Sequence, residues 1–493
     1  MSRRTRLAVL LVLALVVAPA STAPVGASAA PAESTQDGTI LRTFTVSLTP
    51  ETPGQVEVVM AFDLPPDVSR VTTQLPVGAT VRETTGFEQT AEGYRSTSDS
   101  PSIRYALPVN RSTDRGYEYV DTGSWAIAPT PGAGFSYQYR GSAPSIDTDY
   151  EIDGAGVAGR SMLYLGPNTV HERTTSETRF RLVVPESADP LANTETILDT
   201  LAAGVDGIEV GSAAGDHVVI AAPTSVDWGP SGIARGSSDF WVRADLPVAT
   251  ANNVWLHEYV HTRQPTETTA AMRWSIEGGA DYYAALETLR QERIEFAEFQ
   301  HFLGRAARYD EAVLSKPDTW SSPFVPYVKG RLVAGEIDRQ IRVASDGSAT
   351  LATALNGIDG EISLPLFYDA VESAGNATVR ANAERLVETA STPRPWSQEQ
   401  HRAAFQQEIA TATQTATATK TPTAISTETP TAISTATAIE TPEQTAVSTA
   451  TPTGATASAT EFRTTQSSGQ PGFGGVVTVA AVVAAGLLAR RQK

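Results

Sequence analysis

Apolar and polar positions alternate in short runs through the first part of the chain. Residues 43–48 (TFTVSL), 56–62 (VEVVMAF) and 180–185 (FRLVVP) carry this period-two or β-branched pattern, and turn residues separate such runs at regular intervals. A period of two places successive side chains on opposite faces of a strand, so one face of a sheet can be buried. The pattern from about residue 36 to 222 predicts an antiparallel β-sandwich.

The pattern changes after about residue 223. One or two further strands are expected first, and apolar positions then recur every three or four residues, as the buried face of a helix requires. Four helices are predicted from this spacing, at 294–307, 327–343, 364–373 and 379–388. We therefore expect an α+β protein in which an N-terminal β-sandwich domain (30–222) precedes a mainly helical domain (223–410).

Candidate chemistry lies in the helical part, where residues 257–261 have the sequence HEYVH. Residues four apart share one face of a helix, so His257 and His261 can direct ring nitrogens at the same metal ion. Glu258 then lies beside the ion without binding it, where a general base can take a proton from an activated water. The four remaining histidines have no such context, and we expect them to be structural or solvated.

A second polar segment follows after a predicted turn. Pro265 cannot continue the first helix, and a second helix is expected from 269 to 290. Within it Glu277 and Asp281 share a face, which suits Glu277 as a third metal ligand and Asp281 as a carboxylate that orients a ligand histidine, His257 in particular. Glycines 278 and 279 are unfavourable inside a helix, which indicates close approach to a neighbouring helix or to the metal.

These segments resemble those of the gluzincin metallopeptidases, especially the glycyl aminopeptidase and aminopeptidase N branches. The matching pieces are HEYVH, then WSIEGGADYY at 274–283, then VPYVKG at 325–330. The resemblance implies a thermolysin-like, mainly helical catalytic domain with Zn²⁺ bound by His257, His261 and Glu277. It also implies that Tyr327 helps to stabilise the tetrahedral intermediate. A phenol that donates a hydrogen bond to the developing oxyanion would meet that need.

The chain departs from the aminopeptidase N pattern at the segment that binds a substrate's free amino terminus. No Gly-x-Met-Glu-Asn sequence is present. Residues 236–243 (GSSDFWVR) occupy the equivalent stretch, and they are typical of an edge strand that can pair with an extended peptide. Asp239 is the candidate amine-binding carboxylate there. Aminopeptidase and endopeptidase action both remain open.

The two ends of the chain indicate export. Residues 1–29 resemble a secretory signal, with Arg3, Arg4 and Arg6 before an apolar run and a small-residue cleavage site at 27–29. The arginines would also suit twin-arginine export, so the route stays open. The chain has no cysteine, which excludes disulfides, thiolate ligands and cysteine nucleophiles.

The C-terminal part is predicted to be a stalk and an anchor. Residues 411–469 are almost entirely Thr, Ala, Ser and Pro, too polar to form a packed core and suited to O-glycosylation. Residues 470–493 begin with QPGFG, continue with an apolar run and end in basic residues. They resemble the PGF-CTERM sorting signal of archaeal surface proteins, which implies an archaeosortase-type processing enzyme and attachment to a membrane lipid. A plain transmembrane anchor is the alternative, and both place the protein at the outer face of the cell membrane.

Charge is consistent with that location. The formal net charge is −18, and lysine occurs only at positions 316, 329, 420 and 493. Such a surface stays hydrated where salt screens charge, which favours a halophilic archaeon over an ordinary acidic secreted protein. It disfavours nucleic acid as a partner, because that interaction needs a basic face. Asn110 and Asn376 each begin an N-glycosylation sequence.

Two functions are consistent with the sequence. The first is a cell-surface zinc peptidase that hydrolyses peptide or protein substrates, with Glu258 as the base and Tyr327 at the oxyanion. The second is a surface binding or adhesion protein that keeps the peptidase scaffold without turnover. Because every polar group that the resemblance requires is present, we favour the enzyme.

Overall fold

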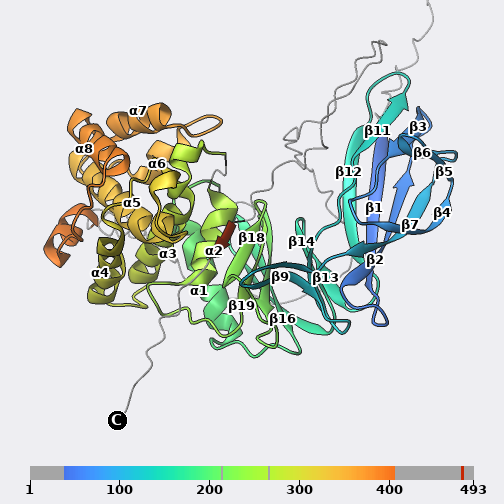
Figure 1. The fold of residues 1–493 in the computed structure, drawn as a ribbon, viewed down its shortest axis with the longest axis horizontal. Coiled ribbons are helices and arrows are strands. Elements are labelled where there is room, and N and C mark those ends of the chain that lie inside the picture. Colours follow the sequence, from blue (N-terminus) through green and yellow to red (C-terminus); the bar gives the residue numbers. More distant parts are fainter. Residues whose placement is uncertain (1–37, 213–214, 265–266, 406–478, 482–493) are drawn as a thin grey trace, which may run out of the picture. The chain divides into compact units, whose positions relative to one another are not determined.

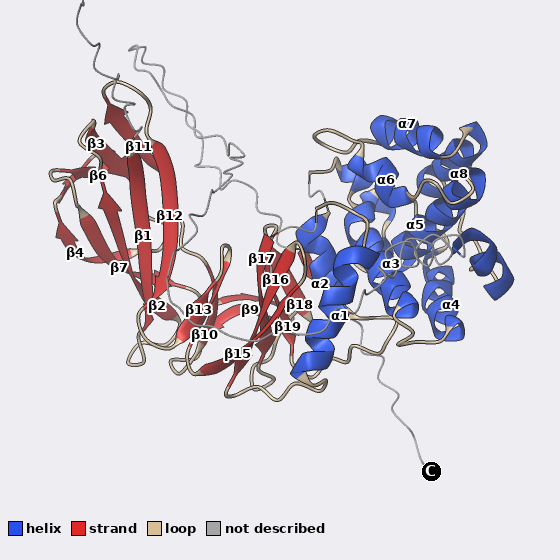
Figure 2. Cartoon of the chain, turned by 180° about the vertical axis from the view of Figure 1, so that it is seen from behind, coloured by secondary structure: helices blue, strands red, loops and turns tan. Residues whose placement is uncertain are grey.

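The computed structural model describes residues 38–212, 215–264, 267–405 and 479–481. Strands dominate the N-terminal part of this range and helices the C-terminal part (Figures 1 and 2), so the α+β prediction is confirmed. The predicted leader, the stalk and most of the sorting tail lie outside the described residues. Within those residues, no helix is both long and apolar enough to cross a membrane.

The N-terminal part contains three sheets. Their strands are β1 Thr39–Leu48, β2 Gln55–Asp63, β3 Val68–Thr73, β4 Thr80–Thr85, β5 Phe87–Thr90, β6 Gly93–Ser96, β7 Ser102–Pro108, β8 Arg111–Thr113, β9 Gly116–Asp121, β10 Ala126–Pro129, β11 Phe135–Tyr139, β12 Ser145–Ile152, β13 Gly156–Ala158 and β14 Met162–Leu165. The strand orders are β12-β1-β2-β7-β4, β11-β3-β6-β5 and β13-β14-β10-β9-β8. Pairing is antiparallel except between β1 and β12, which run parallel.

The alternating sequence pattern buries one face of these strands, as expected. Every second residue of β2, from Val56 to Phe62, is buried, and its neighbours are partly exposed. Buried side chains of β1, β2 and β7 join those of β3 and β5 in one apolar core. This packing of the first two sheets is the sandwich that the sequence predicts.

The sheet that supports the candidate site begins earlier in the chain than expected. Its strands are β15 Asn168–Thr174, β16 Thr178–Pro185, β17 Gly215–Ala222, β18 Gly232–Arg235 and β19 Asp239–Arg243, and the three-residue tail strand β20 Val479–Ala481 pairs with β18. The order is β15-β16-β17-β19-β18-β20, with parallel pairing from β16 to β17 and from β17 to β19. Helix α1, Thr194–Gly207, connects β16 to β17.

This topology corrects two expectations. Residues 168–222 do not belong to an antiparallel sandwich, because β16 and β17 lie in the same sheet as β18 and β19, and α1 is a helix inside that range. The sheet therefore crosses the boundary expected at residue 222. Fully buried β-branched runs suit both a sandwich and a parallel sheet, so the pattern alone did not distinguish them.

The helical part forms one apolar core with one face of this sheet. Its helices are α2 Val254–Arg263, α3 Trp274–Arg290, α4 Phe296–Gly304, α5 Val325–Ala344, α6 Leu351–Asn356, α7 Leu364–Ala374 and α8 Ala377–Glu388, with short 3₁₀ turns at Ala270–Met272, Arg305–Tyr309 and Pro317–Thr319. Each predicted helix is found within a few residues of its expected position. Figure 1 shows α2 beside β18 and β19, the contact that places the HEYVH segment on the sheet.

Helices α3 and α5 approach each other closely at a pair of glycines. A side-chain carbon added at Gly278 would lie 2.6 Å from the carbonyl carbon of Gly330. One at Gly279 would meet nothing nearer than 3.6 Å. The expectation of close approach therefore holds for Gly278 and not for Gly279.

Candidate metal centre

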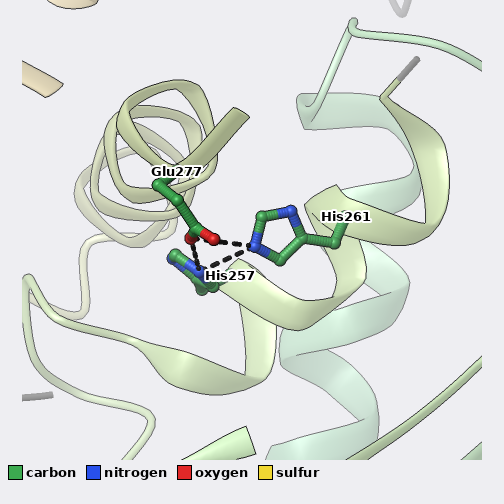
Figure 3. Close-up of side chains that lie close together, drawn as sticks. All are labelled: His257, His261 and Glu277. Carbon is green, nitrogen blue, oxygen red and sulfur yellow. Dashed lines mark hydrogen bonds and ion pairs between the residues drawn. The ribbon is translucent and has the colours of Figure 1, made fainter. Parts of the chain in front are cut away.

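Helix α2 presents both histidines of the HEYVH segment on one side. Asn253 precedes the helix as its N-cap, and its side chain accepts a hydrogen bond from the Leu256 amide; Gln264 follows the helix as its C-cap. His257 and His261 are each 3 % exposed, and their Nε2 atoms lie 2.9 Å apart (Figure 3). Four-residue spacing on a buried helix has thus brought two ring nitrogens to one point.

Glu277, in the first turn of α3, completes a three-residue cluster. Its Oε2 atom lies 3.4 Å from Nε2 of His257 and 3.4 Å from Nε2 of His261. Ligands about 2.1 Å from a tetrahedral zinc ion are roughly 3.4 Å apart, so both distances from Glu277 match such a site. The two histidine nitrogens, 2.9 Å apart, would have to separate by about half an ångström. Among the described residues, the three side chains of this cluster are the group of histidines and carboxylates close enough together to hold a metal ion.

Glu258 lies next to the cluster and is fully buried. Within the part of the chain that the structure describes, neither of its carboxylate oxygens makes a well-formed hydrogen bond, although the backbone amide of Ala234 lies near enough to favour the ionised form. Burial, with further repulsion from Glu277, raises its pKa to about 8. A buried carboxylate without a well-formed hydrogen bond is unfavourable for folding alone, which indicates that its oxygens serve another purpose.

His257 makes a second contact away from the cluster. Its Nδ1 atom lies 2.8 Å from Oδ1 of Asp281, the orienting contact that the sequence predicts. Burial lowers the pKa of His257, but the hydrogen bonds to Asp281 and Glu277 outweigh it and raise the pKa to about 10. Asp281 thus fixes the ring so that Nε2 faces the cluster.

His261 has an orienting partner that the sequence analysis missed. Nε2 of Gln264 lies 2.9 Å from Nδ1 of His261 and donates to the carbonyl of Ile276, also at 2.9 Å. When Nε2 of His261 binds a metal, its Nδ1 carries the proton, so the amide of Gln264 would have to turn its oxygen toward the ring. The i,i+3 spacing from His261 was the only sequence signal for this contact.

Tyr327 lies at the start of α5 beside the cluster. Its ring stacks on that of His257, with centroids 6.2 Å apart and an interplanar angle of 12°. Burial, together with the negative charges of Glu277 and Asp281, raises its pKa well above the ordinary value. The phenol therefore keeps its proton at neutral pH and can donate a hydrogen bond.

The structure does not support the role expected for Asp239. Its carboxylate accepts hydrogen bonds from the amides of Ser161, Met162 and Val218 and from the Ser161 hydroxyl, and the residue is 1 % exposed. In the sheet, Asp239 of β19 lies opposite Arg235 of β18, and Arg235 is three residues along β18 from Gly232. A side-chain carbon at Gly232 would lie 2.7 Å from Glu258, so Asp239 is about 10 Å further along the sheet.

The predicted edge strand also needs correction. Strand β19, which contains Asp239, has β17 on one side and β18 on the other, so its backbone is paired on both sides. Both β18 and β19 contact α2, and β18 is the strand that lies against Glu258, at Gly232. Its four residues are too short a run for the sequence pattern to identify.

The two glycosylation candidates are both on the surface. Asn110 is exposed, and its side chain accepts a hydrogen bond from the Asp121 amide. Asn376 is exposed and caps helix α8 by accepting from the amides of Thr378 and Val379. Glycosylation at these positions stays a prediction.

Comparisons with known proteins add a sorting motif and a partial structural likeness. Residues 470–492 match the PGF-CTERM motif, which indicates cell-surface sorting and anchoring through the C-terminus. Among curated proteins, none matches the chain.

Two solved structures illustrate the likeness. The M1 zinc metallopeptidase from Deinococcus radiodurans is 15 % identical, covers 73 % of this chain and 96 % of its own, and has a TM-score of 0.45. An aminopeptidase N family protein from Idiomarina loihiensis is 10 % identical, covers 74 % of this chain and 76 % of its own, and has a TM-score of 0.43.

Proposed function

We propose that this protein is a zinc-dependent peptidase of the cell surface. The observation that supports it most is the buried cluster of His257, His261 and Glu277, with the fully buried carboxylate of Glu258 beside it. Two imidazoles and a carboxylate, which leave the fourth position of a tetrahedral ion to water or substrate, favour zinc over harder ions. When bound, zinc would polarise the scissile carbonyl and acidify the attacking water.

Each remaining polar group has a role in that chemistry. Glu258 would take the proton from the attacking water and pass it to the leaving amine. Tyr327 would donate a hydrogen bond to the oxyanion that develops on the substrate carbonyl. Asp281 would hold His257 in the orientation that directs Nε2 at the ion.

Export and anchoring complete the proposal. The PGF-CTERM match supports processing by an archaeosortase-type enzyme and attachment to a membrane lipid. Substrates would then be peptides in the medium or neighbouring surface proteins. Because Asp239 is held by backbone donors, we do not propose it as the amine-binding carboxylate of an aminopeptidase.

The experiment compares the native protein with Glu258→Gln in high salt. We expect the variant to bind zinc as the native protein does and to lose about 10²- to 10⁴-fold in peptide hydrolysis, because only the proton transfer is removed. Undiminished hydrolysis with zinc bound would contradict the mechanism. Zinc binding without hydrolysis of any peptide by the native protein would favour the adhesion protein instead.

A matched pair of substrates decides the type of peptidase. One peptide is offered with a free amino terminus and the same peptide with an acetylated one. Cleavage of both at internal bonds would identify an endopeptidase. Stepwise release of residues from the free peptide alone would identify an aminopeptidase and require an amine-binding group other than Asp239.

A further inference from the structure

A buried arginine lies directly behind the aspartate that orients His257. Arg331, in α5, is 3 % exposed, and its Nη1 donates to Oδ2 of Asp281 at 2.9 Å. Oδ1 of the same carboxylate lies 2.8 Å from Nδ1 of His257. The carboxylate group is planar and rigid, so the position of Oδ2 determines where Oδ1 points. Arg331 can therefore set the orientation of His257 through Asp281.

Arg331 is itself fixed by helix α4. Its Nε and Nη2 donate to the carbonyl of Phe302 at 3.2 and 2.9 Å, and its guanidinium lies over the Phe302 ring at 3.6 Å. Phe302 is in the last turn of α4, where carbonyl groups lack a partner within the helix and carry its negative end. The guanidinium thus donates to Phe302 through Nε and Nη2 and to Asp281 through Nη1. The single ammonium group of a lysine could not make these three hydrogen bonds in the same geometry.

Arg331 also compensates negative charge around the cluster. Glu258, Glu277 and Asp281 bring three carboxylates into a small region from which water is largely excluded. Arg331 supplies one positive charge there, and a divalent cation would supply the other two. Without Arg331, the Asp281 carboxylate would lose a charged hydrogen-bond donor at Oδ2, and its orientation toward His257 would be less firmly fixed.

We propose that Arg331 is a positioning residue for metal binding, which acts through Asp281 and His257 and is anchored by the end of α4. The proposal rests on the proposed function, because it assumes that the cluster holds zinc. It connects four helices to one ligand: α4 to Arg331 in α5, Arg331 to Asp281 in α3, and Asp281 to His257 in α2. Loss of such an outer partner weakens metal affinity about 10- to 100-fold in comparable sites.

The test measures zinc affinity by chelator competition on the full chain in high salt. Arg331→Met is expected to weaken zinc binding about 10- to 100-fold. Arg342→Met is the matched control, since Arg342 is equally buried in the same helix and pairs with Asp338, which has no contact with the metal cluster. We expect the control to change zinc affinity by less than about threefold, although it also loses a buried ion pair.

A double-mutant cycle distinguishes positioning from a general effect on folding. If Arg331 acts through Asp281, Arg331→Met should change zinc affinity much less in an Asp281→Asn background than in the native one. Arg331→Lys keeps the charge and should recover part of the affinity, and it serves if Arg331→Met does not fold. Denaturant unfolding of each variant without zinc measures its stability separately.

The outcomes separate the two proposals. Unchanged zinc affinity in folded Arg331→Met, equal losses in Arg331→Met and Arg342→Met, or additive losses in the cycle would each overturn the positioning role while the zinc site stands. Failure of the folded native chain to bind zinc would overturn the metal centre itself, and the positioning role with it.

Discussion

Helix α5 carries two buried arginines, each of which pairs with an aspartate in different surroundings. Near its start, Arg331 pairs with Asp281, whose other oxygen contacts His257. Near its end, Arg342 pairs with Asp338, whose oxygens also accept from the Leu351 amide and the Tyr282 hydroxyl. The second network connects helices to one another, whereas the first ends on a candidate metal ligand.

The comparison shows why a buried ion pair is weak evidence of function by itself. Both pairs remove charges from water, which is costly, and both recover the cost through additional hydrogen bonds. The two arginine–aspartate pairs are therefore alike in burial and in charge. What differs is the group that the carboxylate's second oxygen holds in place: a backbone amide for Asp338 and an imidazole for Asp281.

The largest effect on stability is expected at the pair remote from the metal. Asp338→Ala removes the nearest carboxylate of buried Arg342, and we expect the free energy of unfolding to fall by about 3–5 kcal/mol. Zinc affinity should stay within about threefold of the native value, because no ligand is touched. Urea unfolding and chelator competition measure the two quantities. A loss of zinc affinity as large as that of Asp281→Asn would remove the distinction between the pairs.

A pair of neighbouring glycines sharpens the comparison through the α3–α5 contact. Gly278→Ala places a methyl group against the backbone of Gly330, the residue before Arg331, and should cost about 1–3 kcal/mol by overpacking. Because the helices must separate there, zinc affinity should fall too.

Gly279→Ala is the matched control for that change. The added methyl group would have room, so the greater helix propensity of alanine should stabilise the protein by up to about 1 kcal/mol and leave zinc affinity unchanged. Thermal unfolding compares the two variants. Equal destabilisation by both would mean that the helices are not in contact at Gly278.

The smallest effect concerns pH and the Arg342 end of the helix. Burial, together with the charges of Arg290 and Arg342, lowers the pKa of His401 to about 4. An unfolded histidine has a pKa of about 6.5, so the unfolded chain binds this proton first as the pH falls. Stability from His401 is therefore complete above pH 6.5 and is lost progressively down to pH 4, with about 1 kcal/mol lost at pH 5 after allowance for solvent screening.

His401→Phe should remove this part of the acid sensitivity. The ring of His401 stacks on that of Phe405, so phenylalanine keeps the aromatic contact. Melting temperatures at pH 7 and pH 5 provide the comparison with the native chain. An unchanged pH dependence in the variant would show that folding does not lower the pKa of His401.

The sequence predicted the parts of the site that follow from local spacing. His257 and His261 are one helical turn apart, and a break at Pro265 followed by a helical pattern placed Glu277 and Asp281 on a second helix. The α+β class and the individual helices followed from periodicity in the same way. These features need only the geometry of a helix or strand.

The features that were missed depend on contacts between distant residues. Arg331 lies fifty positions from Asp281, and an isolated arginine in a helical pattern is more often a solvated charge. Asp239 was assigned by its place before the HEYVH segment, but its partners Ser161 and Met162 are almost eighty positions away. The same limit applied to β16 and β17, whose sheet is decided by pairing with β19.

The central claim is that His257, His261 and Glu277 form a zinc site. Elemental analysis of the purified chain in high salt, with His261→Ala prepared in parallel, tests it most directly. The account predicts about one zinc per native chain and none in the variant, because three protein ligands are needed for a site of this kind. A folded native chain that contains no zinc after supplementation would contradict it.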